Sequence, residues 1–312
     1  MEALSLRTYV LKRVLQSAGV IVAASVLAFS LVFLSGDPVA AVVPADATQE
    51  EVQRAIMLYG FDQPLYVQYF RFLGGAVRGD LGDSLRYRVS TMELVSERLP
   101  ATALLVAAGM TITILLGLSL GILAAVRRDS IFDQIALFLS TFGQAMPNFW
   151  FGILLILLFS VTLNWLPPSG YGGLQYLVLP ALTISLYQLP KFLRVVRSSV
   201  HEVLSEDYVR TARSKGISEY AVLVRHALRN ALIPIITLFG LELGAMFGGA
   251  VVTETVFAWP GLGRLLIEAV RSADFPLVQT AILVIALLIT TVNLIVDLTY
   301  VALDPRVRLD NA

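Results

Sequence analysis

The sequence contains no cysteine and only two histidines among its 312 residues. The absence of cysteine excludes disulfides, zinc thiolate sites, iron–sulfur clusters and cysteine nucleophiles. His201 and His226 have no thiol or carboxylate at ligand spacing, so the sequence predicts no metal site. Charged residues are also scarce, at 15%, and the 23 basic residues equal the 23 acidic ones in number. No overall basic field therefore exists that would attract nucleic acid.

Long apolar runs dominate what is present. The hydrophobic share is 57% and the mean hydropathy is +0.76, which is typical of a protein embedded in a bilayer and excludes a large soluble catalytic domain. About 20 apolar residues make one crossing. The sequence therefore predicts an all-α polytopic membrane protein with six transmembrane helices. The runs are 14–36, 99–126, two within 134–190, 231–253 and 276–302.

Three details shape these helices. The first run follows basic residues, as in a secretory signal, but its 23 residues exceed the roughly 7–15 of a signal's apolar region, so we expect an uncleaved helix. Pro100 is expected at the first helical position of the second span. Residues 134–190 carry no charge and are interrupted at 164–173 by turn residues and aromatics, which predicts two helices joined by a tight hairpin.

The basic residues predict the orientation. With the N-terminus inside, 15 Lys and Arg lie on the inner side and 8 on the outer side, or 2 without the long first loop. Both termini are therefore predicted to be cytoplasmic. The expected layout is 1–34 for the cytoplasmic N-terminus and first span, 35–98 for an extracytoplasmic loop, 99–302 for the core of spans two to six, and 303–312 for a cytoplasmic tail.

The outer loop is predicted to form a small helical domain. Thr48 with Glu51 three residues later is a capping-box signature for a helix that Gly60 ends. A second amphipathic helix, 64–73, is rich in aromatic residues. Such a helix either lies in the membrane interface or binds an external partner, and both readings stay open.

The inner connection, 191–230, is predicted to be a helix–turn–helix elbow. Apolar residues keep helical spacing on both sides of Gly216, which has the pattern of a helix stop, and Ser218 can cap the next helix. The second helix is expected to place Ile217, Tyr220 and Val224 on one face. A polybasic, lipid-touching strip is the alternative reading, whereas nucleic-acid binding fits poorly because membrane spans anchor both ends.

This elbow resembles the cytoplasmic loop of ABC importer permeases, and more narrowly the dipeptide/oligopeptide/nickel class, first-permease type. The family's signature is Glu-Ala-Ala, three residues, Gly; here Arg210 and Thr211 replace its first two residues, while Ala212 and Gly216 remain. The resemblance covers essentially the whole chain through the following strings: GDP (36–38), RGDLGDS (78–84), RLPAT (98–102), PNFW (147–150), WLPPSGY (165–171), EDYVRTARSKG (206–216), RHALRNALIP (225–234), ETVFAWPGLG (254–263) and DPR (304–306).

The resemblance implies a pore-forming subunit in a bacterial inner membrane, and not an enzyme. Its partners would be a second homologous permease, two cytoplasmic ATPase subunits, an extracytoplasmic solute-binding protein and the lipid bilayer, with no nucleic acid. The cargo would be peptides or a related solute such as a nickel complex, glutathione or a sugar. The chain has no phosphate-binding loop motif, so ATP and Mg would be held by partner subunits and this chain would bind no cofactor.

Three sets of candidate site residues follow, and none of them is catalytic. The candidates for ATPase coupling are Arg210, Thr211, Ala212, Gly216, Ile217, Ser218, Glu219 and Tyr220. The candidates for the pathway or gate are Pro147, Asn148, Glu242, Glu254 and Trp259. The candidates for binding-protein docking are Tyr66, Tyr69 and Phe70, with the 254–263 loop as part of the same outer surface.

Glu242 and Asp297 are the acids well inside the predicted spans, and intramembrane carboxylates are commonly functional. In a proton-coupled secondary transporter they would form the relay, which is the alternative function. Alternatively, both carboxylates have only a structural role: Glu242 then faces a polar seam between permeases, and Asp297 reaches an inner basic residue. The two halves of the sequence show no internal repeat of the kind typical of secondary transporters.

Overall fold

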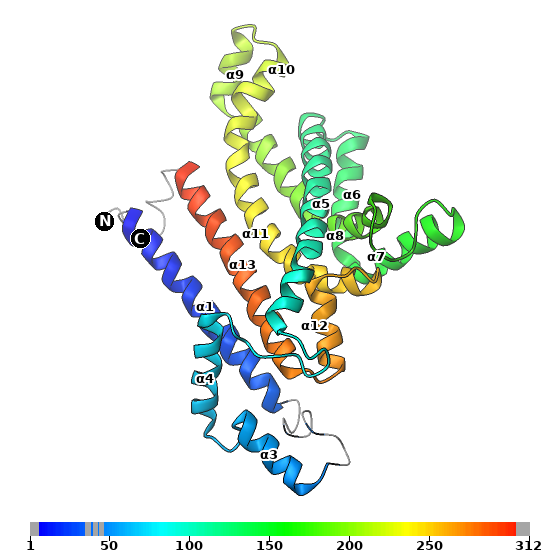
Figure 1. Cartoon of the computed structure of the whole chain (residues 1–312). Helices are drawn as coiled ribbons and strands as arrows, with labels where there is room; N and C mark the ends of the chain where they lie inside the picture. The colour runs from blue at the N-terminus through cyan, green and yellow to red at the C-terminus, as the bar shows by residue number, and fades with distance from the viewer. Residues whose placement is uncertain (1–5, 35–38, 40–42, 44–46, 304–312) are drawn as a thin grey trace.

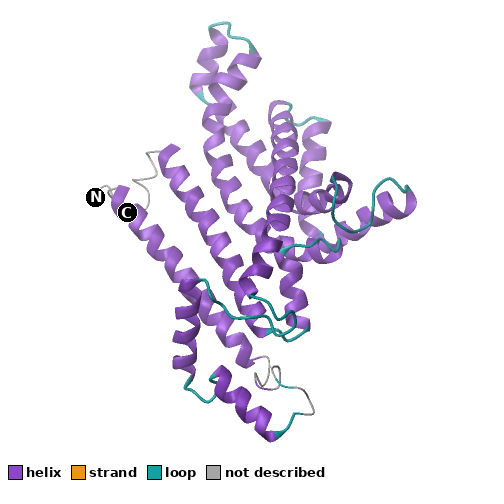
Figure 2. Cartoon of the chain, in the orientation of Figure 1, coloured by secondary structure: helices purple, strands orange, loops and turns teal. Residues whose placement is uncertain are grey.

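The computed structural model describes residues 6–34, 39, 43 and 47–303. Within these residues the regular structure is helical, apart from a single bridge between Asp83 and Ser90 (Figure 2). The strings 36–38 and 304–306 and nearly all of the predicted tail lie outside the described residues. The helices are α1 (Leu6–Leu34), α3 (Gln49–Tyr59), α4 (Leu65–Arg78), α5 (Thr91–Val126), α6 (Ile131–Ala145), α7 (Asn148–Leu155), the π-helix η1 (Ile156–Thr162), α8 (Leu174–Leu204), α9 (Asp207–Ser214), α10 (Glu219–Ala221), the π-helix η2 (Val222–Ala227), α11 (Leu228–Val256), α12 (Leu262–Arg271) and α13 (Phe275–Leu303).

Four helical stretches of the described chain are long and apolar enough to cross a membrane, and a fifth arises if α6 and the α7–η1 helix form one bent span. The four are Val10–Leu31, Thr91–Val126, Glu219–Val256 and Phe275–Thr299. The helix α8 is not among them, and it carries Lys191, Arg194 and Arg197 in its C-terminal half. The structure thus supports a helical membrane protein with four to five candidate spans.

The expected position of Pro100 is wrong. The helix α5 begins at Thr91 and contains Pro100 in its interior, so no break in secondary structure separates the outer loop from the core at residue 98. Hydropathy indicates where an apolar run starts, whereas this helix continues outward through polar residues such as Glu93 and Glu97.

The first of the two helices predicted within 134–190 is divided by a sharp break at Pro147. The helix α6 ends at Ala145, Pro147 caps α7, and the two axes differ by 108°. Proline disfavours helical geometry in the residue before it, and Met146 is accordingly extended, with φ −102° and ψ 136°. The segment after η1 is a turn as predicted, with positive φ at Asn164, Gly170 and Gly172.

The helix α8 lies at the centre of the packing. The helices α1, α13, α11 and α8 follow one another as neighbours, and α8 also packs on α5 and α6 (Figure 1). Three glycines of α5 allow this close approach. A Cβ at Gly109 would collide with Ile184, one at Gly117 would lie 2.5 Å from Phe192, and one at Gly121 would lie 2.7 Å from Val196. The outer helices α3 and α4 and the elbow helices α9 and α10 lie at opposite ends of the molecule (Figure 1).

Candidate functional site

The elbow between α8 and α11 has the local geometry that the sequence predicts. Gly216 has a left-handed φ of +74° immediately after α9, and the Ile217 backbone N–H donates to the Ala212 carbonyl at 3.3 Å. The Ser218 hydroxyl oxygen accepts a hydrogen bond from the Ala221 N–H at 3.4 Å and so caps the next helix. The predicted helix stop and the predicted cap are both confirmed.

The elbow has a small core of its own, which gives it a defined shape. Val209, Ala212 and Val222 are buried together, and Ile217 packs against them. Across the Gly216 turn, the Arg213 guanidinium binds the Glu219 carboxylate through two N–H groups, at 2.8 and 3.2 Å. A paired guanidinium–carboxylate contact restricts geometry more than a single hydrogen bond does. The turn at Gly216 is therefore stabilised both by this small apolar core and by the Arg213–Glu219 ion pair.

One predicted face of the elbow is wrong. Tyr220 was expected to share an apolar face with Ile217, but it is 77% exposed. Ile217 precedes the N-cap residue Ser218 and so lies outside the helix, which means that helical spacing does not place it on the same face as Tyr220. Arg210, Thr211, Glu219 and Tyr220 all lie exposed on the elbow, whereas Ala212 is buried.

A tyrosine connects the elbow to the membrane helix that leaves it. The Tyr208 hydroxyl donates to the His226 carbonyl at 3.4 Å and accepts a hydrogen bond from the Asn230 amide at 2.8 Å. These contacts join α9 to η2 and α11, while α8 enters α9 directly through a short turn. A displacement of the elbow would thus reach both α8 and α11.

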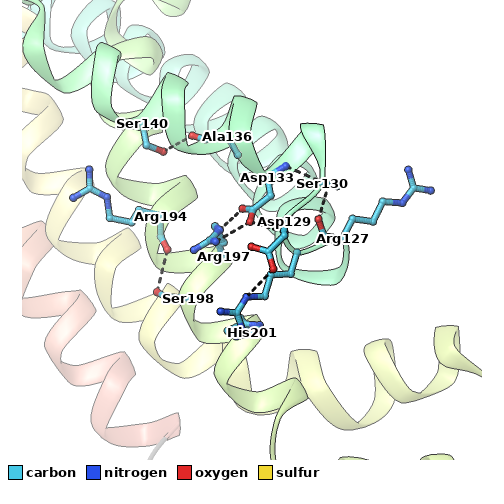
Figure 3. A network of polar contacts seen from close by, with 11 residues as sticks. Arg127, Asp129, Ser130, Asp133, Ala136, Ser140, Arg194, Arg197, Ser198 and His201 are labelled. Carbon is cyan, nitrogen blue, oxygen red and sulfur yellow. Dashed lines mark hydrogen bonds and ion pairs between the residues drawn. The ribbon is translucent and has the colours of Figure 1, made fainter.

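An ion pair fastens α6 to α8 near the same end of the molecule. The Arg197 guanidinium donates to both oxygens of Asp133, with the Nη2–Oδ2 contact at 2.9 Å, and the Asp133 side chain is only 3% exposed (Figure 3). The Ser130 hydroxyl oxygen also accepts from the Asp133 N–H at the start of α6. Sequence reasoning missed this pair; the Ser-x-x-Asp pattern indicates the cap but not the arginine.

The two intramembrane carboxylates each have a cationic partner. Asp297 lies 3.3 Å from Arg13 of α1, which confirms the expectation that it reaches a basic residue. Glu242 is buried and lies 2.5 Å from the Lys191 ammonium. Two paired carboxylates on different helices do not form the proton relay of a secondary transporter, and this geometry disfavours that alternative.

Glu254 and Trp259 are both buried and form hydrogen bonds to other helices. The Glu254 carboxylate is fully buried and accepts from the Thr102 hydroxyl at 2.6 Å and from the Arg264 N–H at 3.0 Å. The Trp259 indole N–H donates to the Ala101 carbonyl at 2.9 Å. These bonds join α5, α11 and the start of α12. Neither of these two side chains is therefore exposed for docking, and both lie where α5, α11 and α12 meet.

Pro147 and Asn148 lie at the break between α6 and α7. The Asn148 side-chain amide donates to the Thr253 hydroxyl at 3.2 Å, so the start of α7 is attached to the C-terminal part of α11. The side-chain oxygen Oδ1 of Asn148 is buried without a hydrogen-bond partner in the described chain. The break thus brings α7 across α8 to α11, which the sequence alone did not indicate.

The outer helices form as the sequence predicts, but their aromatic residues differ in role. The Thr48–Glu51 capping box is present, and the hydrogen bonds from Thr48 hold the pKa of Glu51 below its usual value. The Tyr69 hydroxyl forms a 2.9 Å hydrogen bond with Ser25 of α1, so Tyr69 belongs to the packing and not to a free docking surface. Tyr66 and Phe70, each 66% exposed, remain available.

Comparison with known proteins identifies the family. Residues 117–309 match the family described as "Binding-protein-dependent transport system inner membrane component", and residues 6–106 match its N-terminal companion. The chain belongs to this family. Over 310 residues it is 42% identical to a putative peptide transport system permease protein of Brucella abortus (strain 2308), covering 96% of this chain and 99% of the relative. Over 301 residues it is 40% identical to the glutathione transport system permease protein GsiC of Escherichia coli (strain K12), covering 96% and 98%.

As a binding-protein-dependent permease, the chain is a multi-pass inner-membrane subunit of an ABC importer and not an enzyme. Within the described residues, no cluster of three or more His, Cys, Asp or Glu side chains has the arrangement of a metal site.

Proposed function

We propose that this permease is one of two homologous membrane subunits of an ATP-driven importer of peptides or glutathione. The printed names of its relatives, aligned over nearly their whole length, support this solute class. An extracytoplasmic solute-binding protein would deliver the solute, and two cytoplasmic ATPase subunits would bind ATP and Mg. The sequence has no phosphate-binding loop, which is consistent with ATP hydrolysis on other chains.

The proposed topology has six spans with both termini in the cytoplasm and a small extracytoplasmic helical domain at 35–98. Four candidate spans and the bent α6–α7 pair supply five. The sixth is α8, whose 31 residues are about 46 Å long and exceed the roughly 30 Å hydrocarbon core despite its charges. The charge asymmetry of the sequence supports this orientation.

The elbow is the proposed coupling element, and its geometry is the observation that carries this part of the proposal. It projects from the helical bundle on α8 and α11, has its own small core, and exposes Arg210, Thr211, Glu219 and Tyr220 (Figure 1). Seated in a groove of an ATPase subunit, such a rigid unit would transmit closure of the ATPase pair to both membrane helices.

Docking of the solute-binding protein is proposed on α4. Tyr66 and Phe70 are exposed there, and Phe70 borders a cavity of about 610 Å³ that Arg71, Arg78 and Phe275 also line. Exposed aromatic residues beside arginines are the composition that protein interfaces favour.

Copurification from the native host tests the assembly. A tag on this chain should retain a second permease and ATPase subunits, and ATP hydrolysis should rise when the binding protein and its solute are added. Replacing Tyr66 and Phe70 by Ser should reduce this stimulation and leave basal hydrolysis unchanged. Val77→Ser, at an 88% exposed position of the same helix, should change neither the stimulation nor the basal hydrolysis. A complex without ATPase subunits would overturn the proposed function.

Cysteine labelling tests the topology, because the chain has no cysteine of its own. A Ser169→Cys variant should react with an impermeant maleimide added outside, whereas Ser214→Cys should react only after the membrane is opened. Both positions are exposed in the structure. The reverse pattern would contradict the proposed orientation.

A further inference from the structure

Asp274 is a fully buried acidic residue at the corner between α12 and α13. Its carboxylate accepts hydrogen bonds from the loop between α4 and α5, which lies about 190 residues earlier in the sequence. The donors are the Ser84 hydroxyl at 2.5 Å, the Leu85 N–H at 3.2 Å and the Arg86 N–H at 3.3 Å. We call Asp274 and these three loop residues the Asp274 clasp.

The carboxylate of Asp274 depends on this loop for most of its polar partners. Among the described residues, its remaining donor is the N–H of Leu277 in α13, at 3.4 Å. Ser84 is buried as well, and its hydroxyl oxygen accepts a hydrogen bond from the Tyr87 N–H at 2.9 Å. A buried carboxylate that loses its hydrogen-bond donors is costly, so the clasp fixes the loop to the corner of α12 and α13.

The Asp274 clasp lies beside the surface proposed for docking of the solute-binding protein. Leu85 of the clasp lines the cavity of about 610 Å³ that Phe70 of α4 also lines. Phe275, which follows Asp274 in the chain, lines the same cavity. A protein seated on α4 would therefore lie against a wall that the clasp holds in place.

The helix α12 connects the clasp to two long helices of the bundle. Asp274 follows shortly after the C-terminal end of α12. At the other end of α12, the Leu262 N–H donates to the Thr102 hydroxyl of α5 at 2.8 Å. The Arg264 N–H donates to the Glu254 carboxylate of α11 at 3.0 Å. The 10 residues of α12 thus form a link about 15 Å long between the clasp and both helices, and α11 continues through η2 to the elbow (Figure 1).

We propose that Asp274 is a positioning residue that transmits docking of the solute-binding protein to α12, and through α12 to α5 and α11. This inference rests on the proposed function, since it requires an importer whose ATP hydrolysis a binding protein stimulates. Because Asp274 is fully buried, it does not contact the binding protein itself. It acts by keeping the loop and α12 in one unit, so that a displacement of the loop displaces α12. With the clasp open, the loop moves alone.

An Asp274→Asn substitution weakens the clasp at nearly constant side-chain volume. The amide nitrogen of asparagine cannot accept a hydrogen bond, so at least one N–H donor loses its acceptor, and the ratio of closed to open clasp should fall about tenfold. Amide hydrogen exchange at Leu85 and Arg86 measures this opening and should accelerate by about the same factor. Ser84→Ala, which removes only the hydroxyl, is the milder variant. Asp83→Asn is the matched control, because it makes the same change in charge at an exposed position beside Ser84.

Titration of ATP hydrolysis with the binding protein separates transmission from docking. The complete importer in nanodiscs is titrated with the solute-binding protein of the native host, loaded with glutathione or with a mixture of short peptides. The maximal stimulation and the concentration that gives half of it are measured for each variant. Asp274→Asn should lose most of the maximal stimulation while the half-maximal concentration and the basal hydrolysis stay unchanged. Ser84→Ala should lose less, and Asp83→Asn should lose none.

Each other result overturns the inference. A raised half-maximal concentration with an unchanged maximum would mean that Asp274 shapes the docking surface and transmits nothing. Full stimulation of Asp274→Asn, or unaltered exchange at Leu85 and Arg86, would reject the clasp alone, provided that the unsubstituted importer is stimulated. If the unsubstituted importer is not stimulated, the proposed function fails and the inference fails with it. If Asp274→Asn does not assemble with the ATPase subunits, Ser84→Ala decides by the same criteria.

Discussion

Substituting Gly216 is the sharpest test of the elbow as a lever. Its φ is +74°, and a Cβ built there meets no heavy atom within 4 Å. A larger side chain at this position therefore causes no collision. Any effect must come from the backbone conformation itself, which L-residues adopt reluctantly.

The magnitude follows from this geometry. A left-handed conformation costs an ordinary L-residue about 1–2 kcal/mol, Asn less because its side chain can hydrogen-bond locally, and a β-branched residue more. A change of about 1–2 kcal/mol alters the ratio of the native to the opened turn by about 5–30-fold. We therefore expect the turn to open more often in the order Gly216 ≈ Gly216→Asn, then Gly216→Ala, then Gly216→Val.

Two measurements read out this order. Amide hydrogen exchange at Ile217, whose N–H closes the turn, should accelerate along the series. Solute transport per ATP hydrolysed, measured in proteoliposomes, should fall in the same order while copurification reports whether the ATPase subunits remain bound. The Asn variant controls for loss of glycine without loss of the conformation.

Either of two results would refute the reasoning. If Gly216→Val accelerates exchange but transports with the coupling of Gly216→Asn, the elbow is not the lever. If the exchange at Ile217 is unchanged in the Val variant, the turn does not depend on its left-handed residue, and the structural premise is wrong.

The remaining predictions concern packing and charge. Replacing Asp133 by Asn leaves its arginine partner on α8 unpaired and should cost about 3–5 kcal/mol, seen as a lower melting temperature in detergent, whereas Asp129→Asn, in an exposed pair, should change little. Gly121→Leu overpacks the contact of α5 with α8 and should cost about 1–3 kcal/mol or more, while Gly248→Ala, with open space around it, should be neutral or slightly stabilising. The depressed pKa of Glu51 means that the α3 cap is fully formed above about pH 4.3 and is lost as pH falls through the folded-state pKa. The protection factors of the α3 amides, which correct for the pH dependence of intrinsic exchange, should therefore fall on acidification, and Glu51→Gln should remove that change. Protection factors that are equally low at neutral pH would contradict the cap.

The sequence by itself determined the features that depend on neighbours within a few residues. Thr48 and Glu51 form their capping box, Gly216 stops α9, and Ser218 caps the helix that follows. These contacts span three or four positions, so the spacing of residue types contains the whole interaction. The apolar runs likewise determined a helical membrane protein, since each run must satisfy its backbone within lipid.

The tertiary structure alone decided where the polar residues of those helices point. The sequence could mark Glu242 and Glu254 as unusual, but not that one lies beside Lys191 and the other beneath Thr102. It placed Pro100 at a helix start because hydropathy records the lipid boundary and not the helix end. The reason is physical: a carboxylate in a packed helix is neutralised by whatever side chain the neighbouring helix brings within about 3 Å. That neighbour is set by how the helices cross, and no local pattern of residues contains it.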